Sequence, residues 1–146
     1  MNKVLEQYKK FEGQYITAHS DVAKYLNPKL IKIEEGLVVV EILVEPKMLN
    51  SGWMLHGGIS SLIMDEMLGA TTFTLAEGLF YATSSINVHF LSAGKPGDIL
   101  RVEAKIIKKG SRLIHTEGKM YVEDRVIATA TADLMVVKGS VDPSKK

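Results

Sequence analysis

The chain has 146 residues and a mass of 16.1 kDa, which is the size of one domain. Its 46% apolar and 24% charged residues are close to the average of globular domains and exclude a disordered or low-complexity chain. The net charge of +1 offers no basic footprint for a nucleic acid. The absence of cysteine excludes disulfide scaffolds, thiolate metal sites and thiol nucleophiles.

No targeting or membrane segment is predicted. Charged residues interrupt positions 1–12, where a secretory signal needs an unbroken apolar stretch. The longest uncharged runs, 48–64 and 78–94, are rich in Gly, Ser, Thr, Asn and His, whereas a bilayer span needs about 20 mostly apolar residues. We therefore expect a soluble cytoplasmic protein, with no membrane among its partners.

The N-terminal third predicts helical structure followed by a β-hairpin. Apolar residues at helical spacing indicate an amphipathic helical segment over 1–27, with N-cap candidates at 19–21 for a second short helix that stops at Asn27-Pro28. Residues 29–45 are rich in β-branched side chains on both sides of Glu35-Gly36, which predicts two strands and a turn. Residues 46–53 show no regular pattern.

Residues 57–77 predict one long helix, and its apolar side chains cover so much of the circumference that we expect it to be buried. From residue 80 the period changes to two, which predicts strands over 80–91, 99–107, 112–122 and 126–137 before a frayed polar tail over 139–146. A buried helix followed by an antiparallel meander predicts a single α+β domain over 1–146, with the sheet curled around the helix.

Gly57 and Gly58 stand where the long helix begins. Free N–H groups and the helix dipole favour negative charge there, so this end could stabilise the oxyanion formed when a thioester carbonyl is attacked. A turn that merely starts the helix is the alternative. Asp65 lies two turns further on, where a carboxylate is costly unless it is paired, exposed, or used as a general base or nucleophile.

The spacing of these two residues has a geometric consequence. Gly57 and Asp65 are eight residues apart, which is about 12 Å along a helix. A nucleophile and an oxyanion donor must both lie within about 3 Å of the reacting carbonyl or its attacking water. If both are catalytic, Gly57 of one subunit must act with Asp65 of another, as a twofold dimer would allow.

Further polar residues could take part, each with a plainer alternative. Thr83 and Asn87 are predicted to share one face of the strand 80–91, either to orient water or a carboxylate, or simply to face solvent. We interpret His56 mainly as a helix cap, and Asn50 either as a substrate contact or as ordinary turn chemistry. A basic cluster could meet the phosphates of coenzyme A or form a solvated turn; it consists of Lys105, Lys108, Lys109 and Arg112. The four histidines show no metal-ligand spacing.

Together these residues resemble the hotdog-fold acyl-CoA thioesterases of the PaaI-like (phenylacetic-acid-degradation) group. The similarity rests on Asn50, His56-Gly57-Gly58, Asp65, Thr83-x-x-x-Asn87-x-x-Phe90 and Pro96-Gly97-Asp98, and covers residues 29–138. It implies a hotdog fold, a homodimer with a continuous sheet and often a homotetramer of two dimers. It also implies hydrolysis of an acyl-CoA to a free acid and coenzyme A, with no metal and no cofactor beyond the substrate itself.

The resemblance also implies roles for individual residues. The Gly57 N–H polarises the thioester carbonyl while Asp65 of the partner subunit attacks it or activates water. Thr83 positions that water, and Asn50 helps to orient the reacting group. His56, which could bond the loop or the substrate, is a further candidate for the catalytic set. Coenzyme A is expected at Ser85, Phe90 and the hairpin residues Lys108, Lys109, Gly110, Ser111, Arg112 and Leu113.

Two other functions stay open on the sequence alone. A non-catalytic hotdog module would bind acyl-CoA without cleaving it. A hotdog dehydratase would act on 3-hydroxyacyl thioesters, but it would need a histidine and an acid in a different motif, and His56 does not stand in one.

Overall fold

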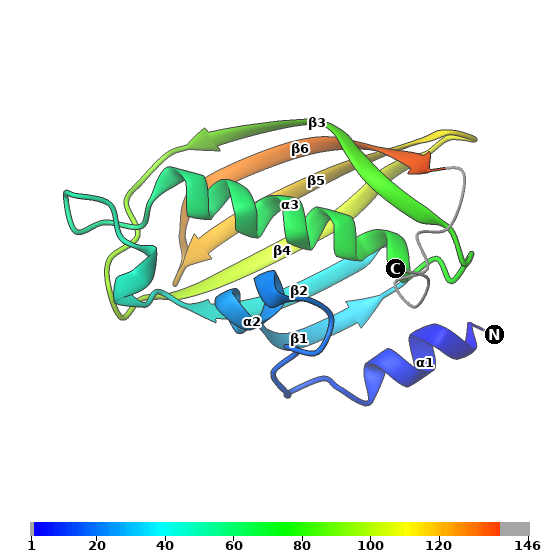
Figure 1. Ribbon diagram of the computed structural model, residues 1–146, viewed down its shortest axis with the longest axis horizontal. Helices are drawn as coiled ribbons and strands as arrows, with labels where there is room; N and C mark the ends of the chain where they lie inside the picture. The colour runs from blue at the N-terminus through cyan, green and yellow to red at the C-terminus, as the bar shows by residue number, and fades with distance from the viewer. Residues whose placement is uncertain (1, 138–146) are drawn as a thin grey trace.

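The computed structural model describes residues 2–137 as one antiparallel sheet curved around a long helix (Figure 1). The strands follow the order β1-β2-β4-β5-β6-β3. Their bounds are β1 (Lys29–Glu34), β2 (Leu37–Leu43), β3 (Phe80–Phe90), β4 (Ile99–Lys109), β5 (Leu113–Val122) and β6 (Arg125–Val137). The predicted α+β class and the hairpin over 29–45 are confirmed. The predicted meander is correct for β4, β5 and β6 only, because β3 pairs with β6 at the far edge of the sheet and not with β4. The predicted tail over 139–146 lies outside the described residues. No helix within residues 2–137 has the length and apolarity needed to cross a bilayer.

The N-terminal segment contains two short helices, α1 (Lys3–Lys9) and α2 (Asp21–Leu26). The predicted limits of the second helix are confirmed, because the Ser20 hydroxyl accepts a hydrogen bond from the Ala23 N–H at 3.0 Å and Asn27 is left-handed. The prediction of helix throughout 1–27 is too broad. Gly13 has a φ of +85°, a conformation that ends regular helix, and residues 12–16 instead run beside β1.

The long helix is α3 (Gly57–Phe73), which ends four residues earlier than predicted. Threonines cause the early end, since their hydroxyls bond to backbone groups of the last turn and compete with helical geometry. Thr74 donates to the Thr71 carbonyl at 2.6 Å and also accepts from the Gly36 N–H at 2.7 Å. The chain then turns through Ala76, whose φ is +54°.

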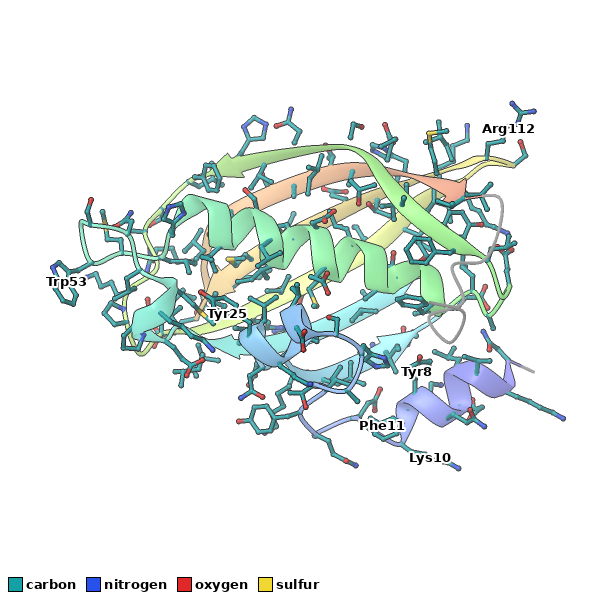
Figure 2. All side chains as sticks on the ribbon, viewed as in Figure 1. Tyr8, Lys10, Phe11, Tyr25, Trp53 and Arg112 are labelled. Atoms are coloured by element: carbon teal, nitrogen blue, oxygen red, sulfur yellow. The ribbon has the colours of Figure 1, made fainter. Side chains whose placement is uncertain are left out.

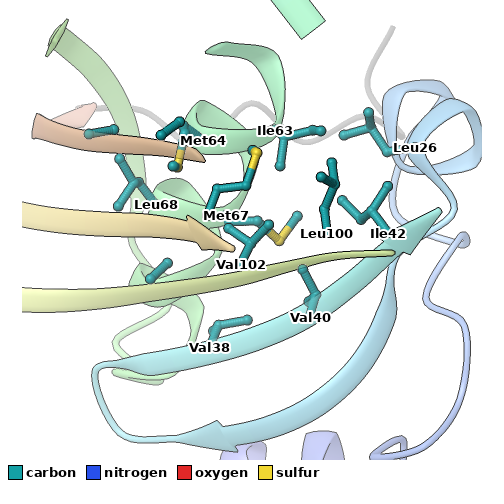
Figure 3. Close-up of a cluster of buried hydrophobic side chains, with 14 of the residues drawn as sticks. Leu26, Val38, Val40, Ile42, Ile63, Met64, Met67, Leu68, Leu100 and Val102 are labelled. Atoms are coloured by element: carbon teal, nitrogen blue, oxygen red, sulfur yellow. The ribbon is translucent and has the colours of Figure 1, made fainter. Parts of the chain in front are cut away.

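One side of α3 forms the core against the sheet (Figure 3). The helix contributes Ile63, Met64, Met67 and Leu68, which meet Val40, Ile42, Leu100 and Val102 of β2 and β4. The expected burial of the whole circumference is wrong for a single chain, because Leu62, Gly69 and Ala70 are only half-buried and Phe73 is 51% exposed. An apolar helix face without cover is therefore available to another molecule.

Strand β3 lies at one edge of the sheet and carries a bulge between Thr83 and Ser85. Paired residues point to the same side of a sheet, and Thr83 pairs with buried Leu134, whereas Asn87 pairs with exposed Thr131. Thr83 therefore faces α3 and Asn87 faces the outer side. The prediction that they share a face is wrong, because the extra residue of a bulge reverses the alternation.

Candidate active site

The start of α3 presents an unused backbone donor. His56 is the N-cap, and its Nδ1 accepts a hydrogen bond from the Gly58 N–H at 2.8 Å, which confirms the capping role. The N–H groups of Ile59 and Ser60 donate to the His56 carbonyl at 2.9 and 3.0 Å. Within residues 2–137 the Gly57 N–H has no acceptor. The helix dipole adds to its preference for a negatively charged oxygen.

This donor borders a cavity of about 350 Å³ between the loop 50–55 and the segment 90–94. Asn50 lines the cavity, but its side-chain oxygen accepts hydrogen bonds from the Gly52 and Met54 N–H groups at 2.9 and 3.2 Å. Asn50 therefore does have the turn chemistry considered above, and it does so beside the candidate oxyanion donor. The Phe90 ring packs against Gly57, since a Cβ built on Gly57 would lie 3.4 Å from its Cζ.

Asp65 lies on the side of α3 that faces β3. The Thr83 hydroxyl donates a hydrogen bond to Asp65 Oδ1 at 2.6 Å. Within the single chain, Thr83 therefore contacts the Asp65 carboxylate directly. Asp65 is half-buried, and its second oxygen has no hydrogen-bond donor among residues 2–137. The geometry leaves that oxygen able to accept a proton from water or to attack a carbonyl.

Glu66, the next residue, differs from Asp65 in its surroundings. Its side chain lines a second cavity, beneath the N-terminal segment. Burial, followed by the charge of Asp65, raises the pKa of Glu66 above its ordinary value. The two adjacent carboxylates on α3 therefore lie in different environments. Of the two, Asp65 is the one that accepts a hydrogen bond from a hydroxyl on β3.

Gly57 and Asp65 both belong to α3, so the separation of about 12 Å along the helix axis holds. The two groups cannot meet at one carbonyl within the chain. A single chain therefore holds the two halves of the candidate site, Gly57 and Asp65, at two separate places on α3.

The hairpin predicted to bind coenzyme A lies at the far end of the molecule from the start of α3. Figure 2 shows Arg112 at one extreme and Trp53, in the loop before α3, at the other. Lys109 is paired with Glu77 beyond the end of α3. Its hydrogen bond lowers the pKa of Glu77, and Glu77 in turn raises the pKa of Lys109. Within one chain the hairpin and Gly57 therefore lie at opposite ends of the molecule.

The structure joins part of the predicted coenzyme A set on the outer side of the sheet. Ser85 donates to Asp133 at 3.3 Å, and Asp133 lies 2.6 Å from His115 Nδ1. His115 in turn pairs with Lys108 across β4 and β5. Phe90 does not join this row, because it pairs with buried Ala128 and faces α3. The row is polar, partly exposed and open to a ligand with hydroxyl or phosphate groups.

The profile of one protein family, described as the thioesterase superfamily, matches residues 54–129. The chain belongs to the thioesterase superfamily. Acyl-coenzyme A thioesterase PaaI of Escherichia coli is 32% identical over 93 residues, which are 62% of this chain and 63% of PaaI.

Two solved structures extend the comparison. A hypothetical thioesterase protein from Streptococcus pneumoniae, solved with coenzyme A, has a TM-score of 0.72 and 26% identity over 76% of this chain and 89% of that one. E. coli PaaI has a TM-score of 0.77 and 24% identity, over 84% of this chain and 88% of PaaI. The pneumococcal protein was also solved with one aspartate, or one threonine, replaced by alanine.

The predicted hotdog fold and PaaI-like group are thereby confirmed, and the chain is a thioester hydrolase. Some residues that shape the site of this thioesterase were not predicted from its sequence. Arg125 donates to the Ser92 hydroxyl and to the Ala93 carbonyl, at 3.2 Å for the latter, and so holds the segment that borders the Gly57 cavity. His115 and Asp133 could not be predicted as neighbours of Ser85, because only the register of the strands brings the three residues together. No local motif would have indicated either set.

Proposed function

We propose that this thioesterase hydrolyses acyl-CoA to a free acid and coenzyme A, at sites shared by two copies of the chain. The observation that carries the proposal is the helix α3 itself. It holds an unused N–H at Gly57 and, eight residues later, a carboxylate oriented by Thr83. In a dimer with a twofold axis, the Gly57 N–H of each copy would meet the Asp65 carboxylate of the other, so the dimer would hold two sites.

Charge development explains what each group does. When the thioester carbonyl is attacked, its oxygen becomes negative, and the Gly57 N–H stabilises it more than it stabilises the neutral carbonyl. Asp65 takes a proton from water as the water oxygen bonds to the carbonyl carbon, and the carbon–sulfur bond then breaks to release the coenzyme A thiolate. In the alternative route Asp65 attacks directly and water cleaves the resulting anhydride. Thr83 fixes the carboxylate orientation in both routes.

The free edge of β3 is the proposed meeting place of the two copies. Among residues 2–137, β3 has a strand neighbour on one side only. Its edge exposes Ile86, Phe90 and, just beyond the strand, Leu91. Pairing of two such edges would satisfy their backbone groups, cover this apolar surface and produce one continuous sheet. A tetramer of two such dimers remains our expectation for the full assembly.

Coenzyme A is proposed to lie with its phosphates at the hairpin after β4. Lys108 and Arg112 are exposed there, Gly110 donates its N–H to the Leu113 carbonyl, and Ser85 adds a hydroxyl from the same side as Lys108. Lys109 would contribute less, because Glu77 already neutralises it. The coenzyme A in the similar pneumococcal structure supports this ligand class.

Replacing the proposed catalytic carboxylate tests the activity. Asp65→Asn keeps the shape and the contact with Thr83 but cannot take a proton, so kcat for a panel of acyl-CoA thioesters should fall by at least about 10²-fold. Asp21→Asn, an exposed change in α2, is the matched control and should behave as wild type. Release of free thiol measures both. Equal activity of Asp65→Asn and wild type would disprove the mechanism, and tight acyl-CoA binding without turnover by wild type would indicate a binding module.

A second experiment tests whether the site is shared. Gly57→Pro removes the N–H donor, yet proline is tolerated at the first position of a helix, and His56 with ψ of 132° suits a residue before proline. The loss of one oxyanion donor should reduce kcat by roughly 10²–10³-fold, whereas Gly57→Ala keeps the N–H and should lose far less.

Mixing subunits then separates the two arrangements. Gly57→Pro and Asp65→Asn chains, unfolded and refolded together, should recover about a quarter of wild-type activity, because half of the dimers are mixed and each carries one intact site of two. A site contained in one chain would give no recovery.

A further inference from the structure

An apolar cavity lies between α3 and the N-terminal segment. The wall formed by the N-terminal segment lies outside residues 54–129, the part of the chain that matches the family profile. Its volume is about 150 Å³. The α3 wall includes Glu66, Ala70 and Phe73, and the facing wall includes Tyr8, Ile16 and Ala23. The lining of the cavity is mostly apolar, which favours an apolar ligand.

The position of the cavity relative to Asp65 is set by the helix. Residues four apart lie one above another on a helix surface, so Asp65, Gly69 and Phe73 form one row that leads from the carboxylate to the cavity wall. A Cβ built on Gly69 would have no heavy atom within 4 Å. Glycine inside a helix costs about 1 kcal/mol relative to alanine, and nothing within residues 2–137 makes use of the space that it leaves.

Glu66 is half-buried and borders the cavity, and burial is the main reason that its pKa is raised. This wall therefore disfavours the charged form of a side chain, and an apolar group would be favoured there.

We propose that the apolar tail of the acyl group passes over Gly69 and fills this cavity while its thioester carbonyl lies at Asp65. The inference rests on the proposed thioesterase activity and names its substrate class. An engineered apolar cavity of about 150 Å³ binds benzene, so the preferred acyl groups carry a tail of about six carbons, either alkyl or aryl. The N-terminal segment then sets the size limit, because it forms the wall opposite α3.

Filling the cavity from α3 tests the assignment. Ala70→Leu adds three carbons at the cavity wall, and Ala18→Leu makes the same change at an exposed position of the N-terminal segment that does not line the cavity. We expect wild type to have a higher kcat/KM for hexanoyl-CoA than for acetyl-CoA or palmitoyl-CoA. Ala70→Leu should lower kcat/KM for hexanoyl-CoA at least tenfold and leave acetyl-CoA within twofold, while Ala18→Leu changes neither. An unchanged ratio of hexanoyl to acetyl kcat/KM in Ala70→Leu would overturn the proposal.

Gly69→Ala tests the passage with a single methyl group. It should lower hexanoyl-CoA turnover more than acetyl-CoA turnover at unchanged oligomeric state and with a higher melting temperature. If the variant instead dissociates the oligomer and keeps the acyl profile, Gly69 serves helix contact between copies and the passage is wrong.

Binding separates this inference from the proposed activity. Calorimetric titration of Asp65→Asn with hexanoyl-CoA and acetyl-CoA, with and without Ala70→Leu, should show a tenfold loss of affinity for hexanoyl-CoA alone. Such a loss without turnover by wild type would disprove the hydrolysis and retain the cavity. Turnover by wild type without such a loss of affinity would support the hydrolysis and disprove the cavity assignment.

Discussion

The two edges of the sheet are treated in opposite ways. The β1 edge is closed by the chain's own N-terminal segment: the Gly13 N–H donates to the Leu30 carbonyl at 2.7 Å, and the Leu30 N–H donates to Gln14 at 2.9 Å. The Glu12 carboxylate also accepts from the Ile33 N–H at 2.9 Å. Unpaired edge groups are a template for association with another chain, and here they are paired within the chain.

The β3 edge has no such cover within residues 2–137, and none of its residues is buried. The difference extends to α3, where Asp65 faces β3 while Glu66 faces the cavity under the N-terminal segment. One side of the helix is thus closed by the chain itself, and the other is open in the single chain. The carboxylate proposed to be catalytic lies on the open side.

Placing the same charge on each edge strand should produce the largest difference between the two edges. Ile86 of β3 and Ile31 of β1 are both isoleucines on an edge strand, and both are partly exposed. Ile86 pairs with buried Ala132 and therefore projects to the α3 side of the sheet. If two β3 edges meet, Ile86→Lys would place an unpaired charge beside their junction, so association should weaken roughly a hundredfold or more, and activity should fall with it. Light scattering after size exclusion measures the assembly.

Ile31→Lys is the matched control, because its edge is already occupied by residues 12–16. It should leave the assembly and the turnover close to wild type. If Ile31→Lys dissociates the protein and Ile86→Lys does not, then the copies meet at the β1 edge and the proposed shared site is wrong.

The parts of the fold that were predicted correctly depend on neighbours in the sequence. The β1–β2 hairpin follows from β-branched runs around Glu35-Gly36, and the end of α2 follows from Asn27 before proline. The start of α3 at Gly57 and the capping role of His56 are equally local. Asn50, His56, Gly57 and Asp65 could be predicted for the same reason, since they lie close together in the sequence, just before α3 and within it.

The parts that failed depend on pairing between distant segments. The bulge at residue 84 separates Thr83 from Asn87, and it is visible only against the register of β6. The row from Ser85 through Asp133 to His115 joins β3 to the hairpin of β5 and β6, which lies far from β3 in the sequence. The closing of the β1 edge by residues 12–16 also needs a tertiary contact, which no periodicity within the segment 1–27 could indicate.

A smaller effect is expected from straining the cover of the β1 edge. Gly13 has a φ of +85° and open space around it, so Gly13→Ala introduces backbone strain without a clash. The free energy of unfolding should fall by about 1 kcal/mol, which corresponds to roughly 2–4 °C in melting temperature. Gly13→Asn should lose less, since asparagine tolerates this conformation better. Equal losses for both variants would show that the backbone conformation of Gly13 is not what stabilises the cover.

The smallest effect concerns the charge of Glu66 on the closed side of α3. Its pKa is raised above 4.5, first by burial and then by Asp65, so the unfolded chain releases its proton at lower pH than the folded one. Stability is therefore lost as the pH rises from 4.5 through the raised pKa. Glu66→Gln should raise the melting temperature at neutral pH by roughly 1–3 °C, and the gain should vanish toward about pH 4.

Glu77, which lies beyond the end of α3, provides a control of opposite sign. The hydrogen bond from Lys109 lowers its pKa below 4.5, so its contribution is present at neutral pH and is lost as the pH falls through the lowered pKa. Glu77→Gln should lower the melting temperature slightly at neutral pH, because the pair is exposed and screened. If both variants shift the melting temperature in the same direction at neutral pH, then the charge of Glu66 is not opposed by burial, and the closed side of α3 is more hydrated than its apolar lining indicates.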